Sequence, residues 1–173
     1  GVSMEDGYNQ TAGSGSLMSI AHEYDYGQNP VGSCANGSAC GNEIKSESPM
    51  GRRLSLDSLK YWEKEFGIDG FRFDLMALID KETMRQADRE LRKLNPGIIL
   101  YGEPWTGGSS PLREKTDKTA LKQVPEGAFN DDFRNALKGQ PDGDEPGWIQ
   151  DGTKRDAPKA AMFVSGRFAA PAQ

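Results

Sequence analysis

The fold of this chain is decided by residues 68–103, IDGFRFDLMALIDKETMRQADRELRKLNPGIILYGE. Residues 68–73 alternate in polarity like a short strand. Ile98–Tyr101 is a continuous apolar run, of the kind that is buried on both faces of a parallel sheet. Between these two segments, Asp80 opens a helix with a regular apolar stripe of Met84, Ala87, Leu91 and Leu94. A strand, a crossover helix and a second strand within roughly 35 residues predict a right-handed βαβ unit and an α/β fold.

One more helix is predicted before this unit. Ser48 followed by Pro49 is typical of a helix start, with the serine as cap and the proline at the first helical position. Gly67 is a natural stop. The apolar residues between them recur near helical spacing: Leu56, Leu59, Trp62 and Phe66. The middle of the chain is therefore predicted to run helix, strand, helix, strand.

The periodicity weakens on both sides of this region. Residues 124–129 predict a third strand, and Asp132–Lys138 a short helix. Residues 140–159, QPDGDEPGWIQDGTKRDAPK, have the composition of a loop. Residues 1–47 are rich in Gly, Ser and Asn and are predicted to be loop or disordered.

Composition excludes several classes of partner. The chain has 173 residues, which suits one ordinary domain, and its 21 Lys and Arg against 26 Asp and Glu give a net charge of −5. A protein without a basic excess is not expected to bind nucleic acid. The sequence holds no run approaching the roughly 20 apolar residues of a membrane span, so no membrane partner is predicted. Its first residues lack the charged and apolar regions of a signal peptide.

The cysteines do not predict a metal site. Cys34 and Cys40 are accompanied by one histidine, His22, whereas a structural zinc site takes four ligands. A local disulfide and two free thiols both fit this spacing, and neither fixes the cellular compartment. We therefore expect neither a metal nor another cofactor.

Two acidic residues follow the two predicted strands, Asp74 the first and Glu103 the second. In a parallel sheet covered by helices, ligands bind outside the carboxyl ends of the strands. Adjacent strands lie about 4.8 Å apart, so carboxyl groups at equivalent heights are expected roughly 5 Å apart. That is the separation of the carboxyl pair in a retaining glycosidase.

The predicted settings of the two groups differ. Arg72 lies two residues before Asp74, on the same side of the strand, and its guanidinium favours an ionised carboxylate, as a nucleophile requires. Glu103 is followed by Pro104 and Trp105, an apolar setting that favours a protonated acid. The Trp105 ring could also stack on a sugar. A simpler interpretation stays open, in which the acids cap helices and the Arg–Asp pair is a structural salt bridge.

The sequence resembles the type I pullulanases, debranching enzymes of the α-amylase superfamily, most specifically in IDGFRFDLMALIDKETM (68–84) and ILYGEPWTGGSSPL (99–112). Residues 36–62 and 128–139 agree with the same family. The segment GFRFDLM resembles the nucleophile segment on the fourth barrel strand, and YGEPW resembles the general-acid segment on the fifth. Isoamylases and branching enzymes resemble these segments more distantly.

The resemblance implies a role for each matching residue. Asp74 corresponds to the nucleophile, Glu103 to the acid/base, Arg72 to the arginine that orients the nucleophile, and Trp105 to a sugar-binding wall. The implied fold is a partial (β/α)8 TIM barrel, roughly strands four to six with their helices. The implied reaction is retaining cleavage of α-1,6 branch linkages, with a branched α-glucan as substrate.

The departures from the family are also informative. The superfamily's third acid follows a histidine on the seventh strand, and this sequence contains no His-Asp pair. The Asn-His segment of the third strand is absent as well, and a full barrel needs about 200–250 residues. We therefore expect the middle of a larger enzyme, inactive by itself. Its segments are predicted as 1–35 unmatched, 36–139 partial barrel and 140–173 loop-rich continuation.

Two alternatives remain beside the enzyme. The chain could be an inactive or non-catalytic α-glucan-binding remnant, or a relative of the isoamylases or branching enzymes. Calcium is common in the superfamily, but Asp142–Glu145 is short and irregular and is interpreted as a solvated acidic loop.

Overall fold

The structure, a computed structural model, describes residues 26–30 and 32–166. The chain divides into two compact units, Gly1–Glu126 and Gly127–Gln173. The predictions for the N-terminal residues up to 25, including those for His22, lie outside the described residues.

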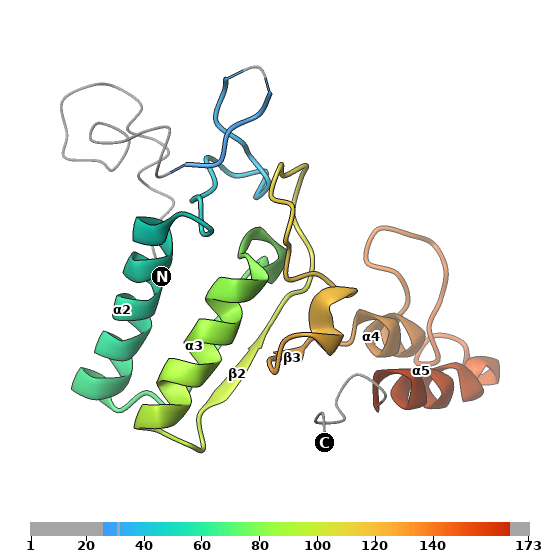
Figure 1. Cartoon of the computed structure of the whole chain (residues 1–173). Helices are drawn as coiled ribbons and strands as arrows, with labels where there is room; N and C mark the ends of the chain where they lie inside the picture. Colours follow the sequence, from blue (N-terminus) through green and yellow to red (C-terminus); the bar gives the residue numbers. More distant parts are fainter. Residues whose placement is uncertain (1–25, 31, 167–173) are drawn as a thin grey trace. The chain divides into compact units, whose positions relative to one another are not determined.

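The first unit contains the predicted βαβ arrangement, of which Figure 1 labels α3 and β2. Its elements are α2 (Pro49–Phe66), β1 (Gly70–Phe73), α3 (Lys81–Leu94) and β2 (Ile99–Gly102), with short 3-10 turns at Met76–Leu78 and Ala120–Lys122. Strands β1 and β2 are parallel, and their register runs from Gly70 opposite Ile99 to Phe73 opposite Gly102. Helices α2 and α3 pack against each other. The α/β class and the parallel pair are thus confirmed.

The predicted helix ends are confirmed in detail. Ser48 caps α2 by accepting a 3.0 Å hydrogen bond from the Gly51 N–H through its hydroxyl. Gly67 ends that helix in the left-handed conformation, with φ of 62°, which glycine adopts without steric cost. Asp80 caps α3 by accepting from the Thr83 N–H at 3.0 Å. These caps satisfy backbone groups that a helix end leaves without a partner.

The core lies between the helices and one face of the strand pair. Met84, Ala87 and Leu91 of the predicted stripe are buried along α3. One cluster joins Leu91, Ile98 and Leu100, with Leu59, Phe71 and Phe73 packed against it, and a second joins Met76, Met84 and Val124. Burial of a side chain of this size contributes about 1.5–3 kcal/mol.

The other face of the strands differs from the prediction. Ile99 is 63% exposed and Tyr101 36%, whereas Leu100 between them is buried. The expectation that this strand is buried on both faces is therefore wrong within this chain. The reason is that α2 and α3 cover only the face to which Leu100 and Phe71 contribute.

Three residues predicted to face the core lie near the surface instead. Trp62 is 41% exposed, Phe66 58% and Leu94 37%. The aromatic rings contact one another, with 4.7 Å between the ring centroids of Trp62 and Phe66. Helical spacing indicated the apolar stripe correctly, but the C-terminal turns of α2 and α3 extend beyond the packed part of the unit.

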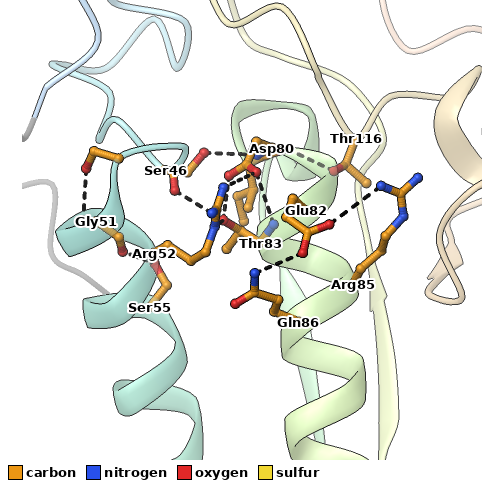
Figure 2. Close-up of polar contacts among 12 residues, drawn as sticks. Ser46, Gly51, Arg52, Ser55, Asp80, Glu82, Thr83, Arg85, Gln86 and Thr116 are labelled. Carbon is orange, nitrogen blue, oxygen red and sulfur yellow. Dashed lines mark hydrogen bonds and ion pairs between the residues drawn. The ribbon is translucent and has the colours of Figure 1, made fainter.

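A buried polar network fixes the start of α3 against α2 (Figure 2). The Arg52 guanidinium donates through Nη2 to Asp80 Oδ1 at 2.9 Å and through Nε to Thr83 Oγ1 at 2.9 Å. The Asp80 side chain is only 3% exposed, and the Asp80 N–H donates to the Ser46 hydroxyl at 2.9 Å. The buried Asp80 carboxylate thus has a charged partner that donates a hydrogen bond to it, as a buried ionic group requires.

A second buried carboxyl has no such partners. Glu126 is 5% exposed, and neither of its carboxyl oxygens has a hydrogen-bond partner within the described part of the chain. Burial raises its pKa to about 7, and its own backbone N–H opposes that rise; Asp88 acts with burial, and Arg92 and Arg85 act against it.

The second unit contains β3 (Gly127–Ala128), α4 (Asp131–Lys138) and α5 (Asp156–Gly166), and its two helices pack together. The predicted helix at Asp132–Lys138 is confirmed, and the predicted strand over residues 124–129 is reduced to two residues. The prediction of a loop up to residue 159 is wrong at its end, because α5 begins at Asp156. Its alanines favour a helix more than the surrounding Gly and Asp suggested.

Three further expectations concern cysteines, metals and membranes. No disulfide joins Cys34 to Cys40. Within residues 26–30 and 32–166, no three acidic, His or Cys side chains are grouped so that they could hold a metal ion. In the same residues, no helix combines the length and apolar character needed to cross a membrane.

Candidate active site

Asp74 and Glu103 come together at the carboxyl end of the strand pair. Each follows directly on the last register pair, Phe73 opposite Gly102. The Glu103 N–H donates to the Phe73 carbonyl at 3.0 Å, which continues the ladder by one step. The two acids, 29 positions apart in sequence, therefore lie at equivalent heights on neighbouring strands.

Arg72 links the two carboxyl groups. Its Nη1 lies 2.9 Å from Asp74 Oδ1, and its Nη2 lies 2.7 Å from Glu103 Oε1. The contact to Asp74 was predicted from the alternation of the strand, whereas the contact to Glu103 was not. Because both oxygens bind one planar fork, they are at most about 8 Å apart.

The exposure of these groups indicates what the bridge contributes. The side chains of Asp74 and Arg72 are 64% and 44% exposed, and that of Glu103 is 17% exposed. Ion pairs at such exposure add little to stability because water screens them. The bridge matters instead for orientation, since it fixes two carboxyl groups relative to one guanidinium.

Glu103 has a second donor, which sequence reasoning missed. The Leu75 N–H donates to Glu103 Oε2 at 3.2 Å. Leu75 has φ of 44° and ψ of 51°, the left-handed conformation, which costs a residue with a Cβ atom about 1–2 kcal/mol. Leucine gives no sequence signal for this conformation, which glycine or asparagine would have suggested.

The surroundings of Glu103 therefore differ from the predicted apolar setting. Its two oxygens accept from a guanidinium and a backbone N–H. The half-buried Trp105 follows closely, with its N–H donating to the Glu103 carbonyl at 2.8 Å. That bond fixes the backbone of Trp105 beside the site, while the contact of its ring with a sugar stays a prediction.

A buried glutamate, Glu43, joins the loop after β2 to an earlier loop. Its Oε1 accepts from the Ser110 hydroxyl at 2.8 Å, and its Oε2 accepts from the Gly37 N–H at 3.0 Å. Burial raises the pKa of this carboxyl, and the hydrogen bonds from Ser110 and Gly37 and the charge of Lys115 oppose that rise. Sequence analysis did not single out Glu43.

The same two loops approach each other closely along their backbones. The Gly108 N–H donates to the Gly37 carbonyl at 2.7 Å. A Cβ atom at Gly107 would lie 2.3 Å from the Ser38 carbonyl oxygen, so only glycine fits there. The glycine pair in the stretch WTGGSS thus lets the loop that follows Glu103 lie against residues 36–43.

A pocket of about 320 Å³ lies beside these loops. Its lining includes Glu43, Leu78 and Arg113, but neither Asp74 nor Glu103. The carboxyl pair therefore lies outside this pocket. The pair consists of the more exposed Asp74 and the more enclosed Glu103, both beside the Arg72 cation. Two such carboxyl groups can supply a nucleophile and an acid–base group to the same bond.

The proteins to which this chain is similar include several pullulanases. No family model matches the chain. The pullulanase of Bacillus subtilis strain 168 is 39% identical over 120 residues, which are 67% of this chain and 16% of that protein. The pullulanase structure from Bacillus acidopullulyticus matches 82% of this chain and 18% of its own, with TM-score 0.76 and 44% identity.

A pullulanase from Anoxybacillus sp. LM18-11 complexed with maltotriose matches 87% of this chain and 22% of its own, with TM-score 0.79 and 35% identity. The fold and these similarities define the class: the chain belongs to the α-amylase family of glycoside hydrolases. Within that class it is homologous to one segment of the type I pullulanases, and it spans about a fifth of the length of the relatives it matches.

Proposed function

We propose that the chain supplies the nucleophile and the acid/base of a debranching enzyme that cleaves α-1,6 linkages in branched α-glucans. Asp74 attacks the anomeric carbon and forms a glycosyl-enzyme, while Glu103 protonates the departing glycosidic oxygen. Glu103 then removes a proton from the water that hydrolyses the intermediate, so that the configuration is retained. The observation that carries this proposal is the Arg72 guanidinium shared by Asp74 and Glu103 at adjacent strand ends.

The positions of the two acids support these separate roles. Asp74, 64% exposed, is open to an incoming sugar, as a nucleophile must be. Glu103, 17% exposed, is the more enclosed of the two acids, and the donors on both of its oxygens fix its orientation. Arg72 orients both groups, and Trp105 is proposed as a wall for the sugar. Residues 36–139 would contribute this catalytic segment.

The uncovered face of the strands supports a barrel as the complete fold. Arg72, Ile99 and Tyr101 belong to the same face as the two acids, since side chains alternate along a strand. In a (β/α)8 barrel the helices cover the outside, and the face opposite to them lines a packed interior. The exposed Ile99 and Tyr101 fit that interior, with β1 and β2 as strands four and five.

The experiment needs an enzyme that provides the rest of the barrel. Residues 36–139 of this chain would replace the homologous segment of the Bacillus subtilis pullulanase, giving a chimaeric pullulanase. Asp74→Asn and Glu103→Gln should each lower kcat on pullulan by 10²-fold or more, the range of acid–base assistance. Asp69→Asn, which changes an exposed acid at the opposite end of β1, should retain the activity of the chimaera. A loss below about tenfold in either site variant would contradict the assignment.

The stereochemical outcome is a separate test. Proton NMR should detect the α-anomer first when the chimaeric pullulanase opens an α-1,6 linkage. Initial release of the β-anomer would exclude the double displacement. Azide should also rescue Glu103→Gln more than Asp74→Asn, because azide attacks a glycosyl-enzyme without help from a general base, whereas Asp74→Asn forms no glycosyl-enzyme for it to attack.

A further inference from the structure

Glu103 is held by two donors of different kinds. Arg72 reaches it through a long side chain that is 44% exposed and also binds Asp74. Leu75 reaches it through its backbone N–H, which lies 3.2 Å from Oε2. A backbone donor has no rotamers to lose, so its direction depends only on the conformation of the chain.

The left-handed conformation of Leu75 reconciles that direction with the path of the chain that follows. The peptide group between Asp74 and Leu75 keeps its N–H on Glu103, and the left-handed φ of 44° lets the chain beyond turn directly into the 3-10 helix Met76–Leu78. The Leu78 N–H donates to the Leu75 carbonyl at 2.8 Å, and Met76 and Ala77 are buried. The surroundings therefore hold Leu75 in a conformation that leucine disfavours.

We propose that Leu75 is a positioning residue: its left-handed conformation lets the chain turn into Met76–Leu78 while its N–H stays on Glu103 Oε2, which fixes the orientation of the acid/base. This inference rests on the proposed function, because it assigns Glu103 the proton transfer. Strained backbone found beside a reacting group is a known means of pre-organisation. What the position requires is a conformation rather than an apolar side chain.

The alternative is that Leu75 matters through its half-buried side chain. The two explanations predict opposite orders for two substitutions. Leu75→Ile keeps the same number of apolar atoms but is β-branched, which makes the left-handed conformation a strong outlier. Leu75→Asn removes the apolar atoms but tolerates that conformation. Positioning predicts that the asparagine variant is the more active, and side-chain packing predicts the isoleucine variant.

The test compares these variants in the chimaeric pullulanase with pullulan as substrate. We expect kcat of Leu75→Ile to be at least tenfold below that of Leu75→Asn, with KM of the two within threefold, since a misplaced catalytic group can cost up to about 10²-fold. If Leu75→Ile does not fold, replacement of Leu75 by the corresponding α-hydroxy acid removes only the N–H and should lower kcat by at least tenfold.

Two results would overturn the positioning role. One is a kcat of Leu75→Ile that lies within tenfold of that of Leu75→Asn. If the ester variant is used instead, the same result is a kcat within tenfold of that of the chimaera with Leu75 intact. The other is a larger loss in Leu75→Asn than in Leu75→Ile. Both are distinct from failure of the proposed function, in which the chimaera with Leu75 intact does not cleave pullulan or the Glu103→Gln variant keeps its activity; either of those would remove the role of Leu75 as well.

Discussion

Replacing the buried Glu126 by glutamine should make stability less sensitive to pH. Glu126 is 5% exposed, its oxygens have no hydrogen-bond partner in the described part of the chain, and its pKa in the folded chain is about 7 against an ordinary value of 4.5. Between these two pH values the unfolded chain has released the proton and the folded chain has not. The folded state is therefore favoured below pH 4.5, and that advantage is lost as the pH rises to 7.

The size of the effect follows from the shift. Each pH unit in this interval costs about 1.4 kcal/mol, so the whole shift corresponds to about 3 kcal/mol of unfolding free energy. Glutamine carries no charge at any of these pH values, so the Glu126→Gln chain loses none of this unfolding free energy as the pH rises. The buried amide has its own cost, but that cost does not depend on pH and changes only the offset between the two proteins.

The assay is urea unfolding at sub-micromolar protein, followed by tryptophan fluorescence at pH 4, 6 and 8. The stability of Glu126→Gln relative to the unsubstituted chain should rise by about 3 kcal/mol from pH 4 to pH 8. Glu114→Gln is the control, because the pKa of this exposed carboxyl is lowered by its hydrogen bond to Lys81, so its pH dependence has the opposite sign. A Glu126→Gln difference that stays constant with pH would refute the reasoning, since it would mean that Glu126 is ionised inside the folded chain.

Further predictions follow from other contacts. Asp80→Ala should cost about 3–5 kcal/mol in urea unfolding, because it leaves the Arg52 network without its buried acid, whereas Asp57→Ala at an exposed pair should leave the unfolding transition nearly unchanged. Gly107→Ala should speed proteolysis in the loop after Glu103, because its Cβ would meet the Ser38 carbonyl; an unchanged cleavage rate would contradict this. The 173-residue chain alone should release no reducing sugar from pullulan above background, and Ile99→Thr should reduce its self-association in sedimentation at high concentration, since Ile99 is 63% exposed.

Sequence reasoning located the elements well where local chemistry determines them. Ser48, Gly67 and Asp80 are capping residues whose backbone geometry follows from their own side chains or from the lack of one. The parallel pair and the acids at its end followed from hydrophobic runs and their lengths. These features depend on a few neighbouring residues, so a single sequence contains them.

Features that depend on distant residues were not predictable in the same way. Periodicity indicates which side chains of a strand or helix are apolar, but not whether another element covers them, and so the exposure of Ile99 and Phe66 was missed. The reach of Arg72 to Glu103 requires the strand register, and the left-handed Leu75 is imposed by its surroundings. The family resemblance assigned roles to the acids without indicating these supporting contacts.

The hydrogen bond from Ser110 to Glu43 has a consequence for the order in which the molecule assembles. It joins residues 67 positions apart, so the chain between them must be closed into a loop before the bond can form. During synthesis, Glu43 and its loop emerge first and wait for the βαβ unit and the segment after it. We expect the loop bearing Trp105 to become ordered late, after the strands that carry the acids have paired. A partly folded chain would then hold both acids in place while the surface proposed to receive the sugar is still unformed.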